Sequence, residues 1–220
     1  MPSGRRYAAY LFDLDGTLVD TAPDLLVALN AVLSARDQLS ADIEFARHWA
    51  GFGARVMIEQ ALFHHDAQPL DSLQLERAFE EFIESYQENL AVESAPYPGV
   101  VETLEQLKSE GVPVGVVTNK MERLSRDLLE SLNLVQLIQV LVGGDTLQVR
   151  KPRPEPVLHA CETLGADPRQ AVLVGDSPTD VETARAAGCG AVCVRYGYSH
   201  GIAPQDLDAD LLVNSLLDVP

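Results

Sequence analysis

The sequence has few basic residues and no long apolar run. Lys and Arg number 16 against 33 Asp and Glu, so the net charge at pH 7 is −17. Affinity for nucleic acids depends on Lys and Arg that neutralise phosphates, so this charge argues against DNA or RNA as a partner. No apolar stretch is long enough to cross a bilayer, and the N-terminal residues do not contain a signal-peptide core. We therefore expect a cytoplasmic protein, monomeric or homodimeric, without a nucleic-acid or membrane partner.

Cysteine is also scarce. The chain has three cysteines, an odd number, at positions Cys161, Cys189 and Cys193, and no two of them form a Cys-x-x-Cys pair. This pattern argues against a disulfide framework and a zinc site, so we expect three reduced, buried side chains. The segment His64-His65-Asp66 resembles a metal cluster, but adjacent side chains diverge, and we do not expect a ligand site there.

The order of apolar segments predicts an α/β fold. Hydrophobic residues make up 46% of the 220 residues, enough for one domain that carries an inserted subdomain. From residue 96 onward, short strand-like runs alternate with helical segments, which is typical of a Rossmann-like, doubly wound parallel sheet. The predicted strands are 7–12, 112–117, 137–142, 171–174 and 191–194, and the predicted helices are 100–109, 121–132, 155–164 and 178–187.

A long helical segment separates the first predicted strand from the second. Between residues 20 and 95 the apolar residues recur with helical spacing, and we find no convincing strand there. The segment is too long for an ordinary crossover between parallel strands. We interpret residues 20–95 as an inserted α-helical cap domain, and residues 1–19 with 96–220 as the α/β catalytic core.

Polar residues stand where several predicted strands end. In an open parallel sheet, ligands bind beyond the carboxyl ends of the strands, so we expect these residues to meet at one edge. They are Asp13 and Asp15 after the first strand, Thr118 and Asn119 after the second, Lys151 after the third, and Asp176 and Asp180 after the fourth. Several carboxylates at one edge repel each other unless a hard divalent cation holds them, and oxygen ligands favour Mg²⁺. A phosphate bound by that ion, Lys151 and Thr118 would be open to attack by a carboxylate.

Together these residues resemble the four sequence motifs of the haloacid dehalogenase superfamily. The matching segments are Asp13-Leu-Asp-Gly-Thr-Leu18, Thr118, Lys151-Pro152 and Gly175-Asp-Ser-Pro-Thr-Asp180. The resemblance implies a phosphatase in which Asp13 attacks phosphorus and forms an aspartyl-phosphate. It also implies that Asp15 protonates the leaving group and later deprotonates the hydrolytic water.

The same resemblance implies how the phosphate and the metal are held. Thr118 and Lys151 would orient and neutralise the phosphoryl group, with Asn119 beside them. Mg²⁺ would be bound by Asp13, the main-chain carbonyl of Asp15 and Asp176. Asp180 would either ligate the ion or support the ligands from behind.

Further segments are similar to those of bacterial phosphoglycolate phosphatases, a group within this superfamily that carries a helical cap. They include Arg47-His-Trp-Ala-Gly-Phe-Gly53, Tyr97-Pro-Gly-Val100, Gly143-Gly-Asp-Thr146 and Tyr196-Gly-Tyr-Ser-His-Gly201. The resemblance implies a small phosphorylated metabolite as the substrate, with 2-phosphoglycolate as the first candidate. Phe52 departs from that group, which often has Asn between the two glycines of the cap loop.

Three alternatives stay open. N-acetylmuramic acid 6-phosphate phosphatases share the motifs and the cap type, so a sugar phosphate is an alternative substrate. A β-phosphoglucomutase-like phosphomutase is an alternative enzyme, although Thr17 stands where such mutases usually have Val. A phospho-accepting signalling domain also combines acids, Thr and Lys on a parallel sheet, but Asp15 and the inserted cap argue against it.

The cap loop supplies candidate substrate contacts. Gly51 and Gly53 would let the main chain approach a ligand. Arg55 would neutralise a substrate carboxylate, although a surface arginine is the simpler interpretation. Trp49 and Phe52 are more consistent with the core of the cap than with a stacking platform.

Overall fold

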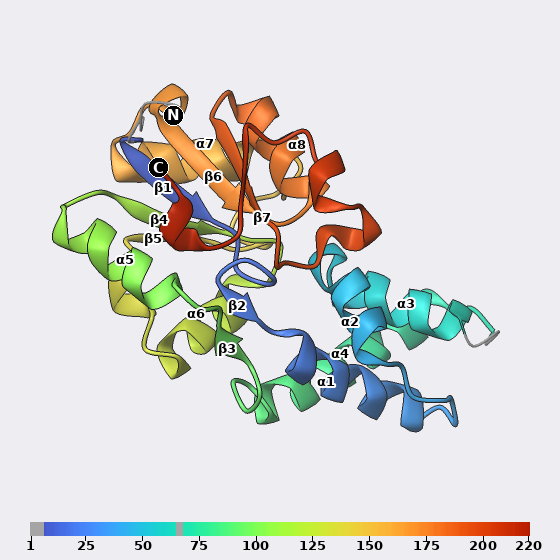
Figure 1. Ribbon diagram of the computed structural model, residues 1–220. Helices are drawn as coiled ribbons and strands as arrows, with labels where there is room; N and C mark the ends of the chain where they lie inside the picture. The colour runs from blue at the N-terminus through green and yellow to red at the C-terminus, as the bar shows by residue number, and fades with distance from the viewer. Residues whose placement is uncertain (1–6, 65–67) are drawn as a thin grey trace.

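The computed structural model describes residues 7–64 and 68–220. Its main layer is a six-stranded sheet in the order β5-β4-β1-β6-β7-β8, in which every neighbouring pair of strands is parallel (Figure 1). The strands are β1 (Ala9–Phe12), β4 (Val114–Val117), β5 (Val140–Val142), β6 (Ala171–Gly175), β7 (Gly190–Val194) and β8 (Leu211–Val213). This arrangement confirms the predicted parallel α/β sheet.

Helices cover both faces of the sheet. Along β1, Tyr10 and Phe12 belong to one buried hydrophobic cluster, whereas Ala9 and Leu11 belong to another. Side chains of α5 and α6 complete the first cluster, and side chains of α7 and α8 complete the second. These helices are α5 (Val100–Ser109), α6 (Glu122–Ser131), α7 (Glu155–Leu164) and α8 (Pro178–Ala187). The sheet is therefore doubly wound, which explains why its strands are apolar almost throughout.

The structure differs from the sequence prediction at the edges of the sheet. β5 begins at Val140 rather than at Leu137, because Val135–Leu137 form a short 3₁₀ turn. β8 has no counterpart among the predicted strands. Its three residues are too few to show a periodic pattern, and it forms through pairing with β7, where Leu211 lies opposite Val192.

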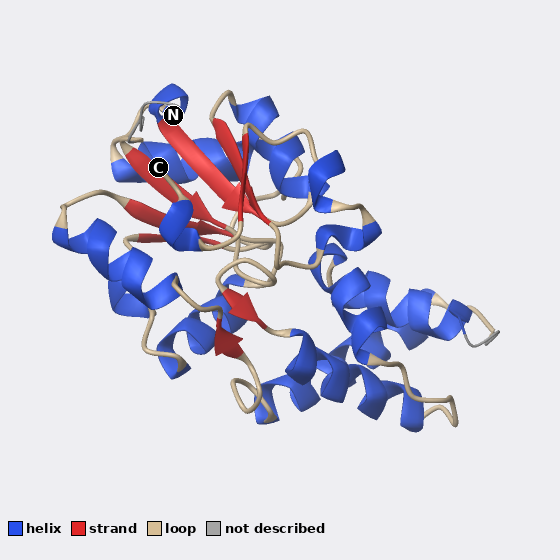
Figure 2. Cartoon of the chain, viewed as in Figure 1, coloured by secondary structure: helices blue, strands red, loops and turns tan. Residues whose placement is uncertain are grey.

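A two-stranded antiparallel ribbon joins the sheet to the helical segment. β2 (Val19–Asp20) pairs with β3 (Ala95–Pro96), as Figure 2 shows between the sheet and the lower helices. The expectation of no strand between residues 20 and 95 is therefore wrong at the two ends of that segment. Strands of two residues cannot show the alternation by which a strand is recognised in a sequence.

The four helices of this segment share a hydrophobic cluster of their own. It contains Leu29, Ile58, Phe82 and Tyr86, among others. The helices are α1 (Ala22–Ser34), α2 (Ile43–Trp49), α3 (Ala54–His64) and α4 (Ser72–Glu88). A largely separate core supports our division into a cap of residues 20–95 and a catalytic core, which remains a proposal.

The cysteines are free and buried, as predicted. Burial raises the pKa of the Cys161 thiol to about 11, which makes it a poor nucleophile at neutral pH. Of the segment His64-His65-Asp66, only His64 belongs to the described residues, and its ring lies 5.9 Å from that of Phe45. Among the residues that the structure describes, we find no helix with both the length and the apolar character needed to span a membrane.

Candidate active site

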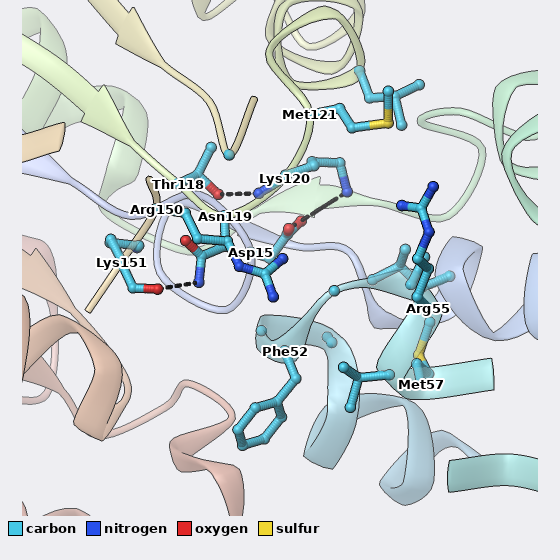
Figure 3. Close-up of a pocket in the computed structure, with 18 of the residues that line it drawn as sticks. Asp15, Phe52, Arg55, Met57, Thr118, Asn119, Lys120, Met121, Arg150 and Lys151 are labelled. Carbon is cyan, nitrogen blue, oxygen red and sulfur yellow. Dashed lines mark hydrogen bonds and ion pairs between the residues drawn. The ribbon is translucent and has the colours of Figure 1, made fainter. Parts of the chain in front are cut away.

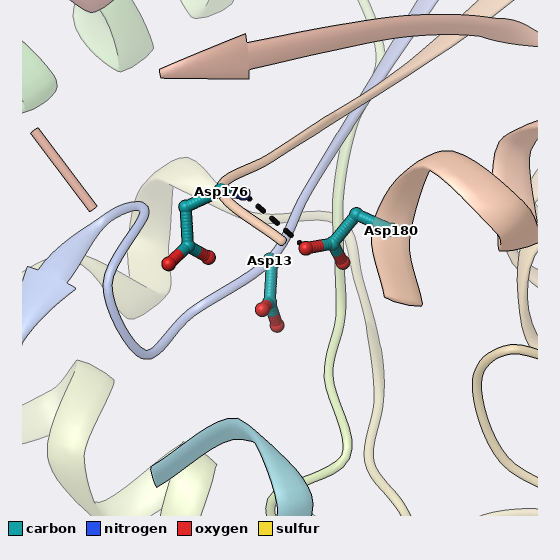
Figure 4. A group of neighbouring side chains, drawn as sticks. All are labelled: Asp13, Asp176 and Asp180. Atoms are coloured by element: carbon teal, nitrogen blue, oxygen red, sulfur yellow. Dashed lines mark hydrogen bonds between the residues drawn. The ribbon is translucent and has the colours of Figure 1, made fainter. Parts of the chain in front are cut away.

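Three buried aspartates meet at the carboxyl edge of the sheet. Asp13 directly follows β1, Asp176 directly follows β6, and Asp180 lies in the first turn of α8. One carboxylate oxygen of each lies within 4.8 Å of the others. Figure 4 shows the three side chains approaching one another from the ends of two strands and one helix. The fold thus brings together three of the four predicted metal-binding aspartates.

Lys151 forms ion pairs with two of these aspartates. Its ammonium lies 2.8 Å from Asp13 Oδ1 and 2.7 Å from Asp180 Oδ1. Burial favours the neutral amine, but the two carboxylates outweigh it and raise the pKa of Lys151, so the side chain stays charged. Burial also raises the pKa of Asp13 to about 6, against the opposing effect of the Lys151 charge. The Asn119 side-chain amide fixes this loop by donating a 3.2 Å hydrogen bond to the Lys151 carbonyl.

Both carboxylate oxygens of Asp180 have partners within the protein. Oδ1 accepts from Lys151, and Oδ2 accepts from the main-chain N–H groups of Asp176 and Ser177 at 3.2 Å each. The Ser177 hydroxyl donates to Oδ2 as well, at 2.6 Å. Burial would raise the pKa of Asp180, but the Lys151 charge and these hydrogen bonds lower it. Both oxygens of Asp180 therefore already accept hydrogen bonds from groups of the protein.

The Asp176 carboxylate accepts hydrogen bonds but forms no ion pair within residues 7–64 and 68–220. Its Oδ1 accepts from the Thr17 hydroxyl at 3.1 Å, and its Oδ2 accepts from the Tyr198 amide at 2.6 Å. Burial raises the pKa of Asp176 well above its ordinary value, and the charges of Asp180 and Asp13 raise it further. The chain packs so tightly here that a Cβ on Gly197 would lie 2.2 Å from Asp176 Cβ.

Asp15 is paired with Lys120, which is not among the site residues predicted from the sequence. The Lys120 ammonium lies 3.1 Å from Asp15 Oδ1 and 4.4 Å from the centroid of the Tyr86 ring. Burial opposes its charge, but Asp15 and Tyr86 raise the pKa of Lys120. Its amide also donates a 3.2 Å hydrogen bond to the Thr118 hydroxyl oxygen. The sequence signal for Lys120 is its place directly after two predicted site residues at a strand end.

A cavity of about 310 Å³ lies between the core and the cap loop. Its lining on the core side includes Asp13, Asp15, Thr118, Asn119, Lys120 and Lys151. Figure 3 shows Arg55 of the cap on the other side of the pocket from Asp15 and Lys120 of the core, with the Phe52 ring directed away from these two residues. Arg55 is paired: its Nε and Nη2 donate to Glu76 at 2.9 and 2.7 Å. Its guanidinium also lies 3.5 Å above the centroid of the Phe79 ring. Arg55, a predicted substrate contact, therefore borders the cavity, and Glu76 of the cap already pairs with its guanidinium.

The predicted glycines of the cap loop also line the cavity. Gly53 adopts a φ of 94°, which few other residues tolerate. A Cβ on Gly51 would lie 2.2 Å from His200 Nε2, so glycine at 51 allows close approach to the core as well. Trp49 packs against the cap cluster as expected. Phe52 does not belong to that cluster: it lines the cavity, and its ring centroid lies 4.3 Å from that of His200, because the loop docks on the core.

Known proteins resemble the chain over almost its whole length. A family model of haloacid dehalogenase-like hydrolases matches residues 10–194. The chain is 40% identical over 211 residues to a phosphoglycolate phosphatase of Chromobacterium violaceum, covering 96% of this chain and 94% of that protein. It is 41% identical over 213 residues to a phosphoglycolate phosphatase of Caulobacter vibrioides, covering 97% and 89%.

A solved structure shares the same architecture. The crystal structure of a predicted phosphoglycolate phosphatase from Haemophilus somnus matches with a TM-score of 0.91 and 33% sequence identity, covering 97% of this chain and 96% of that one. The curated relatives and the family match together support a phosphoric monoester hydrolase, as the motifs predict. The chain therefore belongs to the haloacid dehalogenase-like hydrolase family.

Proposed function

We propose that the protein is a Mg²⁺-dependent phosphatase that hydrolyses a small phosphate monoester through an aspartyl-phosphate on Asp13. The observation that carries this proposal is the charge of the buried site. Among the described residues, Asp13, Asp176 and Asp180 share one ammonium, that of Lys151. Three carboxylates and one ammonium leave two negative charges in excess, which a divalent cation would neutralise.

The donor set fits Mg²⁺. The clustered carboxylate oxygens lie within 4.8 Å of one another and are the donors that this hard cation prefers. Asp13, Asp176 and the main-chain carbonyl of Asp15 would hold the ion, while Asp180 supports Asp176 by accepting one hydrogen bond from its main-chain amide. When bound, the cation offsets the charge of the phosphoryl group and of the attacking carboxylate.

Asp13 is the proposed nucleophile. One of its oxygens attacks phosphorus, the bond between phosphorus and the leaving alkoxide breaks, and the phosphoryl group stays on Asp13. The Lys151 ammonium, 2.8 Å from Asp13 Oδ1, is placed to neutralise the phosphoryl oxygens as they arrive. Thr118 and Asn119 line the same wall of the cavity and are proposed to orient that group.

Asp15 is the proposed acid and base. It gives its proton to the leaving alkoxide and then accepts a proton from the water that attacks the aspartyl-phosphate. That second step releases phosphate and restores the Asp13 carboxylate. Lys120, at 3.1 Å, fixes the position of the Asp15 carboxylate, and we add it as a positioning residue.

The proposed substrate is 2-phosphoglycolate, which would yield glycolate and phosphate. The support comes from the relatives with that activity in their names and from the size of the cavity. Its volume of about 310 Å³ lies at the small end of the about 300–1,000 Å³ that is typical of ligand pockets. The loop with Gly51, Gly53 and Arg55 is proposed to contact the part of the substrate beyond the phosphate.

The test measures phosphate release from 2-phosphoglycolate, N-acetylmuramic acid 6-phosphate and glucose phosphates, each with Mg²⁺ and with a chelator. We expect release that requires Mg²⁺ and favours 2-phosphoglycolate, and none from the Asp13→Asn variant. Preference for a sugar phosphate would retain the mechanism and overturn the substrate. No release from any ester would favour the phosphomutase or the phospho-accepting domain.

A further inference from the structure

Four cationic side chains line the cavity, and three of them are paired with acids. The pairs are Lys151 with Asp13, Lys120 with Asp15, and Arg55 with Glu76. Arg150 is the fourth cation. Within residues 7–64 and 68–220, its exposed guanidinium forms neither an ion pair nor a side-chain hydrogen bond. Arg150 is therefore the cation of the described cavity wall whose charge no paired acid offsets.

Arg150 and Lys151 are neighbours in the chain but reach different parts of the site. The Lys151 side chain is buried against Asp13, whereas Arg150 extends toward the cap. Arg150 Nη1 lies 3.6 Å from the position that a Cβ on Gly53 would occupy. Figure 3 shows its guanidinium directed into the pocket beside Asn119. Arg150 thus reaches from the phosphate end of the cavity to the cap loop.

The main chain around Arg150 is held in place, while its side chain is free. The Arg150 carbonyl accepts a 2.9 Å hydrogen bond from the Arg153 amide. On the other side, the Asn119 side chain binds the Lys151 carbonyl at 3.2 Å. The main chain therefore fixes where the Arg150 side chain begins, and the rotamers of that side chain set how far the guanidinium lies from Lys151.

A second anionic group on the substrate would need a cation at this place. Once the phosphate lies at Lys151 and Thr118, the rest of a short substrate extends toward the cap, where Val56, Met57 and Phe79 line the cavity. A guanidinium binds a carboxylate through two parallel N–H···O hydrogen bonds, which gives both charge and geometric complementarity. Arg55 also has N–H groups left on its guanidinium, but Glu76 already offsets its charge through two hydrogen bonds, so a substrate carboxylate gains less there.

We propose that Arg150 binds the carboxylate of the substrate and is the residue that selects short phosphate monoesters with a second anionic group. The inference rests on the proposed phosphatase function and assigns the recognition of the non-reacting end of its substrate. It places the selecting cation on the loop of the catalytic lysine rather than on the cap helix that carries Arg55.

The test compares 2-phosphoglycolate with 2-hydroxyethyl phosphate, in which a CH₂OH group replaces the carboxylate. The measured quantity is the ratio of kcat/KM for the two esters. In Arg150→Gln this ratio should fall about 10- to 100-fold, mainly through KM for 2-phosphoglycolate, because a charge-assisted hydrogen-bond pair is lost. Arg150→Lys should restore part of the ratio, since it keeps the charge but not the two-pronged geometry.

Arg153→Gln is the matched control. This exposed arginine lies on the same loop and pairs with Glu155 at 3.0 Å, so the ratio should keep its native value. An unchanged ratio in Arg150→Gln, an equal fall in Arg153→Gln, or a larger fall in Arg55→Gln would overturn the assignment. If the native protein itself does not prefer 2-phosphoglycolate, the proposed substrate fails and the inference fails with it, which is visible before any variant is measured.

Discussion

The amide of Tyr198 donates a 2.6 Å hydrogen bond to Asp176 Oδ2, and the hydroxyl of the same tyrosine holds the start of the first cap helix. That hydroxyl accepts from the N–H groups of Thr21 and Ala22 at 2.8 and 2.9 Å and donates to Asp20 Oδ1 at 2.9 Å. Since the Thr21 side chain makes no capping bond to α1, Tyr198 satisfies helix N–H groups that the local sequence leaves open. One residue therefore ties the acidic site to the cap.

Replacing Tyr198 by Phe should lower the free energy of unfolding by about 2–4 kcal/mol, because two buried N–H groups lose their acceptor. The measurement is urea unfolding in chelator. Tyr196→Phe is the control, because its hydroxyl makes one bond, to the Thr17 carbonyl at 2.9 Å, and its loss should cost about 1 kcal/mol. Equal losses in the two variants would contradict the capping role.

Replacing Lys120 by Met should leave the buried Asp15 carboxylate without its cation. We expect the free energy of unfolding to fall by about 3–5 kcal/mol and kcat to fall at least about tenfold, since Asp15 loses its fixed position. Steady-state kinetics and urea unfolding measure the two effects. Lys108→Met is the control: Lys108 is exposed and bonds the Gln136 carbonyl at 3.0 Å, so its effect on stability should stay within about 0.5 kcal/mol. A native kcat in a folded Lys120→Met variant would argue against the positioning role.

Replacing Asp176 by Asn should abolish the stabilisation of the protein by Mg²⁺. In chelator near neutral pH the variant should be at least as stable as the native protein, because burial raises the pKa of Asp176 and its charge is unfavourable there without a cation. Mg²⁺ at about 100 times its dissociation constant should stabilise the native protein by about 2.7 kcal/mol and the variant far less. The measurement is thermal unfolding with and without Mg²⁺. An equal increase of the unfolding temperature by Mg²⁺ in both proteins would exclude Asp176 as a ligand.

The pKa of Asp13 predicts how the stability of the metal-free protein changes with pH. The native state keeps the proton up to a pKa of about 6, whereas the unfolded state loses it near the ordinary 3.8. The native state therefore binds more protons between these values, so its stability falls as pH rises from about 4 to about 6, by about 3 kcal/mol. Urea unfolding in chelator across this range should show that Asp13→Asn loses this contribution. A pH-independent difference between native and variant would contradict it.

The meeting of side chains at the ends of parallel strands could be predicted from the sequence. Asp13, Thr118 and Asp176 each follow a recognisable apolar run, and the topology of a parallel sheet places such residues at one edge. The contact between the Lys120 ammonium and the Tyr86 ring could not be predicted, because Tyr86 belongs to a helix of the cap. The hydrogen bond from the Thr21 amide to the Tyr198 hydroxyl could not be predicted either, because it joins residues 177 positions apart that only the tertiary fold brings together.

The pairing of Arg55 could not be predicted from the sequence either. Its place beside the two cap-loop glycines indicates a substrate contact, and no local pattern reveals that Glu76, 21 residues later, holds two of its N–H groups. Arg150 stands next to the catalytic lysine candidate, but only the fold shows that its side chain reaches the cavity and stays unpaired among the described residues.

Covalent phosphorylation of Asp13 is the central claim, and it can be observed directly. The protein is mixed with Mg²⁺ and 2-phosphoglycolate, quenched in acid during turnover, digested, and the peptide that contains Asp13 is examined by mass spectrometry. We predict a phosphoryl group on Asp13 in the native protein and none in Asp13→Asn, which should also release no phosphate. Turnover without a phosphorylated Asp13, together with a near-native rate in Asp13→Asn, would contradict the mechanism.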